Sequence, residues 1–423
     1  MTPLLGCVAD DLTGATDIAL ALCNHGMSTS VSIGTPGGKT IQTDAAAHVV
    51  ALKSRTAAAE SAVVASRASI AALRASGCQR FFFKYCSTFD STADGNIGPV
   101  IDALLDELSA QSAVVCPAFP ANGRTMSAGV LLVDGVPLAE TPMRDHPLTP
   151  MRESSVPRLL DAQANGPPST LIALETVRNG SAAIRTELSA AVNSGSRYIV
   201  IDAESDEDLA RIAKAVGDTP LLTGSAGLGA ALPEAYRNSR LLEGAASSAP
   251  LPSVPGPTAI LAGSCSAATL RQIDRAAGSV ASYYVDILTL QTDTDEFDAF
   301  CRTVAEASAS GDVIVYTSTA APALKEVQAK LGVSNAADRA ESLLAETAAF
   351  LKHQGVRRFI VAGGETSGAV AAALNVDKLD VGPEIEPGVP WMIGRDPEAL
   401  LIAFKSGNFG SDDFFQHAIK VAA

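Results

Sequence analysis

Two adjacent carboxylates, Asp10 and Asp11, follow the apolar run at residues 4–8 and come just before Thr13 and Gly14. This order predicts a buried strand, a tight turn and the start of a helix, and open α/β sheets bind ligands at such points. Two acids in one turn lose hydration and repel each other, so we expect a cation, a metal or a substrate hydroxyl beside them. The alternative is that one of the two acids only caps the helix.

Basic side chains follow other predicted strands of the same half. Arg55, Lys84 and Arg124 each come after a short apolar run. Cations at converging strand ends suit a small carboxylate ligand, which arginine can bind through two hydrogen bonds at once. Taken singly, each would be an ordinary solvated surface charge.

Three turns rich in small residues follow predicted strands of the second half, at residues 261–269, 359–368 and 405–410. Glycines let a ligand approach the backbone, and free N–H groups at a helix start favour phosphate oxygens. Any one of these turns would be an ordinary strand-to-helix connection, in which Ser264 or Thr366 caps a helix. Glu365 could help to position a metal or only complement the helix dipole. Together the three turns predict a nucleotide pocket.

The two halves together favour phosphoryl transfer. One half offers acids and cations for a small polar anion, and the other offers turns suited to phosphate. The reaction needs in-line placement of acceptor and nucleotide, charge neutralisation, usually by Mg²⁺, and a base for the acceptor hydroxyl.

The elements that must position these residues form two domains. A chain of 423 residues is too long for one ordinary core. The proline-rich residues 244–257 predict a linker between domains at 1–243 and 258–423. In each domain, strand-like runs alternate with helical stretches, which predicts two doubly wound α/β domains with mainly parallel sheets. Residues 126–157 are rich in proline and predict a looped or hairpin insertion.

Composition excludes several classes of protein. The net charge of −15 argues against a nucleic-acid partner. The seven cysteines include no CxxC pair and no zinc-type spacing, which predicts a reduced, cytoplasmic protein. No apolar stretch is long enough to predict a membrane span.

Several sequence blocks are similar to those of a known family. The segments VADDLTGATD, ALKSRT, FKYCSTFDSTADGNIGPV, CPAFPANGRT, TGSAGLG, AGSCSAATLRQ and GGETSG resemble, in this order, the four-carbon acid sugar kinase family. The blocks FKYCSTFDST and MRDHPLTPM most resemble its 3-oxo-tetronate kinase branch. The resemblance implies a sugar-acid-binding N-terminal domain, a nucleotide-binding C-terminal domain, and catalysis in the cleft between them.

The activity that this resemblance implies is ATP-dependent phosphorylation of the 4-hydroxyl of 3-oxo-tetronate. The alternatives are a D-threonate or D-erythronate 4-kinase and, in another class, a nucleotide and sugar-acid sensor without turnover. ATP, with Mg²⁺, and a sugar acid are the expected ligands. No nucleic-acid or membrane partner is expected, and a homo-oligomer is compatible with the resemblance.

The resemblance also implies which residues bind each ligand. On the nucleotide side these are Ser264, Gly363, Gly364, Glu365, Thr366 and Gly407. On the sugar-acid side they are Asp10, Asp11, Arg55, Lys84, Ser87, Thr88 and Asp90, to which Arg124 is added from its position after a strand. We expect Asp11 to be the general base or a metal-orienting acid, with Asp10 and Asp90 as the rival candidates.

Overall fold

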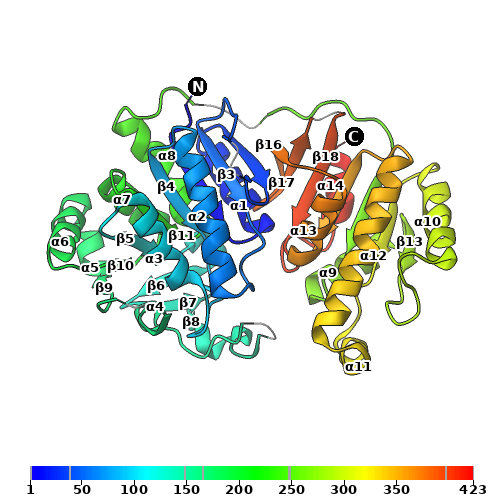
Figure 1. Ribbon diagram of the computed structural model, residues 1–423, viewed down its shortest axis with the longest axis horizontal. Coiled ribbons are helices and arrows are strands. Elements are labelled where there is room, and N and C mark those ends of the chain that lie inside the picture. The colour runs from blue at the N-terminus through cyan, green and yellow to red at the C-terminus, as the bar shows by residue number, and fades with distance from the viewer. Residues whose placement is uncertain are drawn as a thin grey trace. The chain divides into compact units, whose positions relative to one another are not determined.

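The computed structural model describes residues 2–37, 40–146, 149–163, 166–245, 249–395 and 398–422. Its internal contacts divide the chain into two compact units, residues 1–247 and 248–423. The division falls within the proline-rich stretch. Both units are α/β structures (Figure 1). No helix in the described part of the chain combines the length and apolar character that crossing a bilayer requires.

The first unit is built on a sheet of strands that all run parallel to their neighbours. In spatial order these are β2 (Thr29–Ile33), β3 (Ala47–Ala51), β1 (Leu5–Ala9), β4 (Arg80–Lys84), β11 (Leu221–Gly224), β5 (Ala113–Cys116), β10 (Tyr198–Ile201) and β9 (Thr170–Ile172). Every residue of β1 and β3 is buried, as expected for strands of a sheet that helices cover on both faces.

The helices of the first unit form two layers, one on each face of the sheet. Right-handed crossovers that run in opposite directions along a sheet lie on opposite faces. The chain passes from β1 towards β2, but from β3 to β4 and on to β5 it runs the other way. One layer holds α1 (Leu12–Asn24), α5 (Leu174–Arg178), α6 (Ser181–Asn193), α7 (Asp206–Val216) and α8 (Ala226–Asn238). The other holds α2 (Ala59–Ala75), α3 (Ile97–Leu108) and α4 (Val156–Gln163), with α2 and α3 side by side in Figure 1.

This topology explains where the candidate acids and cations meet. β1 and β4 are neighbours, but the chain leaves their carboxyl ends in opposite directions. Such a reversal leaves a crevice beyond the strand ends, where open α/β sheets bind ligands. Asp10 and Asp11 follow β1 at this point, and Lys84 is the last residue of β4.

The second unit combines parallel and antiparallel pairing. Its strand order is β13 (Ala281–Tyr284), β14 (Val313–Tyr316), β12 (Thr258–Ala262), β15 (Arg358–Ala362), β18 (Leu400–Lys405), β17 (Val389–Gly394) and β16 (Lys378–Glu386). The first five are parallel, whereas β17 pairs antiparallel with both of its neighbours. The core includes the chain's single tryptophan, Trp391, which is fully buried on β17.

Helices again cover the two faces of this sheet. α9 (Ala267–Ala276) packs with α14 (Phe414–Val421). α12 (Val333–His353) packs with α10 (Asp295–Ser308), α11 (Ala321–Leu331) and α13 (Gly364–Ala373), and Figure 1 shows α12 and α13 side by side. The chain leaves β12 towards β13 but passes from β14 across β12 to β15, so the reversal lies between β12 and β15. The small-residue turns at Ser264 and Gly363 follow these two strands.

The insertion in the first unit is a small antiparallel sheet. It consists of β6 (Arg124–Ser127), β7 (Val130–Val133) and β8 (Val136–Pro137). The hairpin prediction for this region is therefore confirmed. Pro147 and Leu148 of the MRDHPLTPM block lie outside the described residues.

Candidate active site

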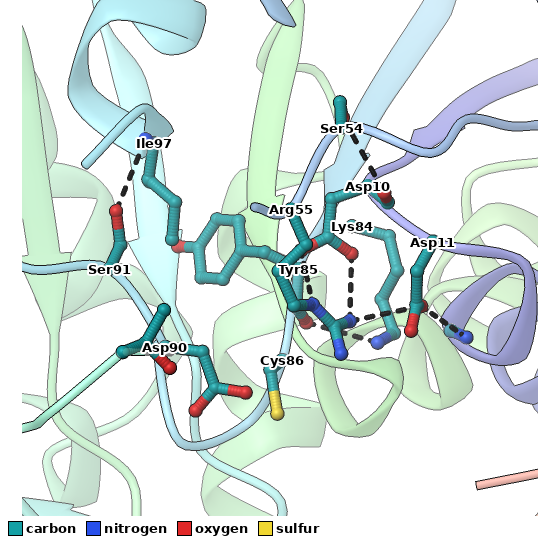
Figure 2. Close-up of polar contacts among 12 residues, drawn as sticks. Asp10, Asp11, Ser54, Arg55, Lys84, Tyr85, Cys86, Asp90, Ser91 and Ile97 are labelled. Atoms are coloured by element: carbon teal, nitrogen blue, oxygen red, sulfur yellow. Dashed lines mark hydrogen bonds and ion pairs between the residues drawn. The ribbon is translucent and has the colours of Figure 1, made fainter. Parts of the chain in front are cut away.

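Beyond β1, one arginine bridges the two aspartates. Arg55 Nε lies 2.8 Å from Asp10 Oδ2, and its Nη2 lies 2.9 Å from Asp10 Oδ1 and 2.9 Å from Asp11 Oδ1. Figure 2 shows the guanidinium between the two carboxylates. The backbone holds this arrangement, because the amides of Ser54 and Arg55 donate to the Asp10 carbonyl. A two-point contact of this kind fixes orientation as well as charge.

Asp11 is also the N-cap of α1. Its Oδ1 accepts a 2.7 Å hydrogen bond from the Gly14 amide, and its Oδ2 accepts one of 2.9 Å from the Thr13 hydroxyl. The capping role and the ion-paired role are thus both present in one side chain. Asp10 has only 5% of its side chain exposed, against 16% for Asp11, so Asp11 is the more accessible carboxylate.

The surroundings shift the pKa values of Asp10 and Asp11 in opposite directions. Burial raises the pKa of Asp10 above its ordinary value, and Arg55 offsets only part of this effect. Burial also opposes ionisation of Asp11, but the charges of Arg55 and Lys84 outweigh it and leave the pKa of Asp11 below its ordinary value. Asp11 is therefore firmly ionised at neutral pH.

Lys84 supplies a second buried cation at this end of the sheet. It is 3% exposed, and its Nζ donates to the Tyr85 carbonyl at 3.0 Å. It also lies 3.7 Å from Asp17 Oδ2. Arg55 and Lys84 thus lie beside the aspartates at this end of the sheet, and their part in binding a ligand stays a prediction.

The loop after β4 carries the next candidates. Thr88 donates a 2.6 Å hydrogen bond to Asp90 Oδ1 and contacts the Cys86 thiol at 2.9 Å. Phe89 and Asp90 both have left-handed backbones, with φ of 65° and 46°. Ser87 precedes Thr88 on this loop, and Asp90 lies to the side of the Arg55 ion pairs in Figure 2.

Arg124 lies on a different element. It begins β6 in the small sheet, where its Nη1 donates to the Asn122 carbonyl. Its buried Nε has no hydrogen-bond partner among the described residues. The contacts of Arg124 therefore place it with the insertion, and none of those described joins it to Asp10 or Asp11.

In the second unit, the turns after β12 and β15 lie against each other. Gly363 has φ 129°, and a Cβ at this position would come within 3.3 Å of the Ser264 amide and 3.0 Å of Thr366 Oγ1. Ser266, not Ser264, caps α9, since its hydroxyl accepts from the Thr269 amide at 3.2 Å. Ser264 therefore does not cap this helix. Among the described residues, the one hydrogen bond of its Oγ is accepted from the Ser266 amide, at 3.2 Å.

The remaining predicted nucleotide residues lie at the same end of this unit's sheet. Gly364 begins α13, and Glu365 stands in its first turn. Gly407 follows β18, and a Cβ built on it would lie 2.3 Å from Ser264 Oγ. The three small-residue turns therefore do come together.

The sequence did not single out Lys405 and Gln272, which support the turn after β18. Both are fully buried. Burial lowers the pKa of Lys405 to about 7, although Glu386 acts in the opposite direction. A lysine as the last residue of the otherwise apolar strand β18 was the available signal.

The depressed pKa of Lys405 predicts a pH effect on stability. The unfolded chain holds this proton up to its ordinary pKa of 10.5, whereas the folded chain releases it at about 7. Unfolding therefore binds a proton between these values, so the second unit should become more stable as pH rises from 7 towards 10. Trp391 fluorescence reports melting of this unit, and the rise should be absent in Lys405→Met. An equal rise in that variant would contradict the prediction.

No group of three or more His, Cys, Asp or Glu side chains able to hold a metal occurs among the described residues. Mg²⁺ commonly binds through substrate phosphates with one or two carboxylates rather than in an all-protein cage.

Comparison with known families gives two matches. Residues 5–232 match the family model of a sugar-binding N-terminal domain, and residues 259–415 match that of a nucleotide-binding C-terminal domain. The candidate acids and cations lie in the first match, and the small-residue turns in the second.

Curated relatives are similar over nearly their whole length. A 3-oxo-tetronate kinase of Cupriavidus necator is 44% identical over 99% of this chain and 97% of its own. A 3-oxo-tetronate kinase of Haemophilus influenzae is 39% identical over 98% and 99%. Among solved structures, Haemophilus influenzae protein HI1011 matches with a TM-score of 0.79 at 39% identity, covering 99% of this chain and 100% of that one. A Salmonella typhimurium protein matches with a TM-score of 0.85 at 38% identity, covering 98% of both chains. With both domain models matched and full-length relatives of this identity, the chain belongs to the four-carbon acid sugar kinase family.

Proposed function

We propose that this protein is an ATP-dependent kinase that phosphorylates the 4-hydroxyl of 3-oxo-tetronate. The observation that carries the proposal is full-length similarity, 44% over 99% of the chain, to relatives named 3-oxo-tetronate kinase. The geometry supports it, because polar residues gather at the topological reversal of each unit's sheet. The first unit would bind the sugar acid and the second the nucleotide.

On the sugar-acid side, we assign separate roles to the two aspartates. Asp10 has both oxygens engaged by Arg55 and would hold that cation in place. Asp11 is more accessible and firmly ionised, so it would orient the 4-hydroxyl and accept its proton. Lys84 and the loop carrying Ser87, Thr88 and Asp90 would line the substrate.

On the nucleotide side, the backbone would be the main ligand. The amides of residues 364–366 at the start of α13, and the turn at Gly407, would face phosphate oxygens, with Ser264 between them. Mg²⁺ bound to the nucleotide would neutralise charge on the transferring phosphoryl group. Phosphoryl transfer requires that the acceptor hydroxyl of the sugar acid reaches the γ-phosphate of ATP. That the reaction takes place between the two units stays a prediction.

An ADP-release assay across several four-carbon acids tests the proposal. Purified protein, ATP and Mg²⁺ are combined with 3-oxo-tetronate, D-threonate or D-erythronate, and ADP is followed with a coupled enzyme. We expect the highest kcat/KM with 3-oxo-tetronate. Preference for another acid would reassign the substrate, and ATP binding without ADP release for any acid would indicate a sensor.

Gly363→Ala tests the nucleotide turn. The added methyl group would intrude on Ser264 and Thr366, and the positive φ would be strained as well, so we expect the Kd for ATP to rise about tenfold or more. Titration calorimetry with ATP measures this.

Gly355→Ala is a matched control for Gly363→Ala. Gly355 also has a positive φ, of 98°, but a Cβ there would meet nothing within 4 Å. Both variants should lose about 1 kcal/mol of stability from backbone strain, and only Gly363→Ala should lose ATP affinity. Equal ATP affinity in the two variants would rule out the assignment of this turn.

A further inference from the structure

The turn that follows β18 is held from inside the second unit by a buried lysine. Lys405 Nζ donates to the carbonyls of Ser406, Gly407 and Phe409 at 2.9, 3.0 and 3.1 Å. It also contacts Thr269 Oγ1 at 3.3 Å. The amino group of this fully buried side chain is thus directed at the carbonyls of one short loop.

Gln272 holds the rest of the same loop. Its Nε2 lies 3.0, 3.2 and 2.9 Å from the carbonyls of Phe409, Gly410 and Ser411. Its buried Oε1 has no partner among the described residues. A buried amide with an unmatched acceptor costs stability, so what this side chain contributes to the loop is its donors.

This inward arrangement fixes where the amides point. In a trans peptide the C=O and the following N–H point in opposite directions. The Gly410 carbonyl turns to Gln272 while the next amide, that of Ser411, donates to Glu386 Oε2 at 2.6 Å, which follows this rule. The amides that follow the other inward carbonyls, those of Gly407, Asn408 and Gly410, therefore point away from Lys405.

These outward amides are available to a ligand. Within the described part of the chain, the amides of Gly407, Asn408 and Gly410 donate no hydrogen bond. Gly407 lies directly against Ser264, the serine that does not cap α9. The amides of Gly407 and Asn408 are successive, and successive amides on one side of a loop form a concave anion site.

We propose that Lys405 and Gln272 are positioning residues for nucleotide binding. They draw the loop carbonyls inward and so preorganise the amides of Gly407, Asn408 and Gly410 for the phosphate groups. The inference rests on the proposed function, which supplies ATP as the ligand. Preorganised amides bind an anion without the cost of ordering the loop.

The carbonyls that Lys405 contacts also accept hydrogen bonds from other groups. The Gly407 carbonyl also accepts from Ser266 Oγ at 2.6 Å and Thr269 Oγ1 at 2.9 Å. The Ser406 carbonyl also accepts from the Phe409 amide, and the Phe409 carbonyl from Gln272. Lys405→Met would therefore leave no orphan carbonyl, and exchanging a buried amino group for an apolar side chain of similar length is often neutral or stabilising.

The test compares Lys405→Met with Lys352→Met in the full-length protein. Lys352 is a half-buried lysine of the same unit whose Nζ donates to the Leu374 carbonyl, outside this loop. We expect Lys405→Met to raise the Kd for ATP about tenfold or more while the Trp391 melting temperature at pH 7.5 is unchanged or higher. Lys352→Met should keep the wild-type Kd, and the KM for the sugar acid should be unchanged in both variants.

Gln272→Met provides a second variant, which should also weaken ATP binding while keeping the KM for the sugar acid. Wild-type Kd values for ATP in both Lys405→Met and Gln272→Met would overturn the inference. So would a fall in melting temperature that accounts for the lost affinity, because it would mean a merely structural role. If the wild-type protein itself fails to bind ATP, the proposed function fails instead, and the two failures are thereby distinguished.

Discussion

Replacing Asp11 by Asn is expected to lower kcat by about 10²- to 10⁴-fold, the range for loss of a general base. The amide keeps an oxygen for the Gly14 N–H and so can still cap α1. It cannot accept a proton, whereas the carboxylate is held ionised by Arg55 and Lys84. Steady-state kinetics with saturating ATP and 3-oxo-tetronate measure the effect.

Two further variants make this result specific. Asp102 is a carboxylate of the same unit that pairs with Arg197 at 3.2 Å, away from the candidate site, so Asp102→Asn should keep the wild-type kcat. Asp90→Asn tests the rival acid. Full turnover in Asp11→Asn with a collapse in Asp90→Asn would move the catalytic role to the loop after β4.

The alternation of strands and helices was enough to predict both α/β units, but not every strand. The sequences of β16 and β17 show no clear strand pattern, because Pro383 and Pro390 interrupt them. Pro383 lies within the shift in register between Val381 and Glu384 of β16, the kind of irregularity where a strand tolerates proline. Such bulges depend on the partner strand and leave no local sequence signal.

The sequence of β2 also shows no clear strand pattern, for a different reason. Its sequence alternates hydroxyl and apolar residues and lacks a continuous apolar run. Its serines pair instead with a buried histidine of β3, since Ser30 and Ser32 contact the two ring nitrogens of His48 at 2.8 and 2.9 Å. A polar contact between strands cannot be seen before the strands are paired.

The sequence predicts those residues of the candidate site that lie just after the carboxyl end of a strand. Asp10, Asp11, Arg55 and Lys84 each adjoin a strand carboxyl end, so topology alone brings them together. Lys405 was not singled out, because its role is to hold backbone carbonyls. Residues with such a role can be identified only from the hydrogen bonds of the folded structure.

Arg55→Met should destabilise the first unit by about 3–5 kcal/mol, the usual cost of removing one partner from a buried ion pair. The substitution keeps the apolar length of the side chain but leaves Asp10 and Asp11 facing each other without their shared cation. Burial already raises the pKa of Asp10, so its charge would be the harder one to keep. Hydrogen exchange of β1 and α1 peptides measures the opening free energy in this unit.

The double variant Asp10→Asn/Arg55→Met shows whether charge is the cause. Removing one carboxylate relieves the uncompensated repulsion, so the double variant should be more stable than Arg55→Met alone, and the two changes should not add. Arg197→Met breaks a more exposed ion pair and should cost only about 0–1 kcal/mol. If Arg55→Met cost no more than Arg197→Met, Asp10 and Asp11 would not need Arg55 in the folded state. The bridge of one guanidinium across two buried acids would then have to be explained by ligand binding alone.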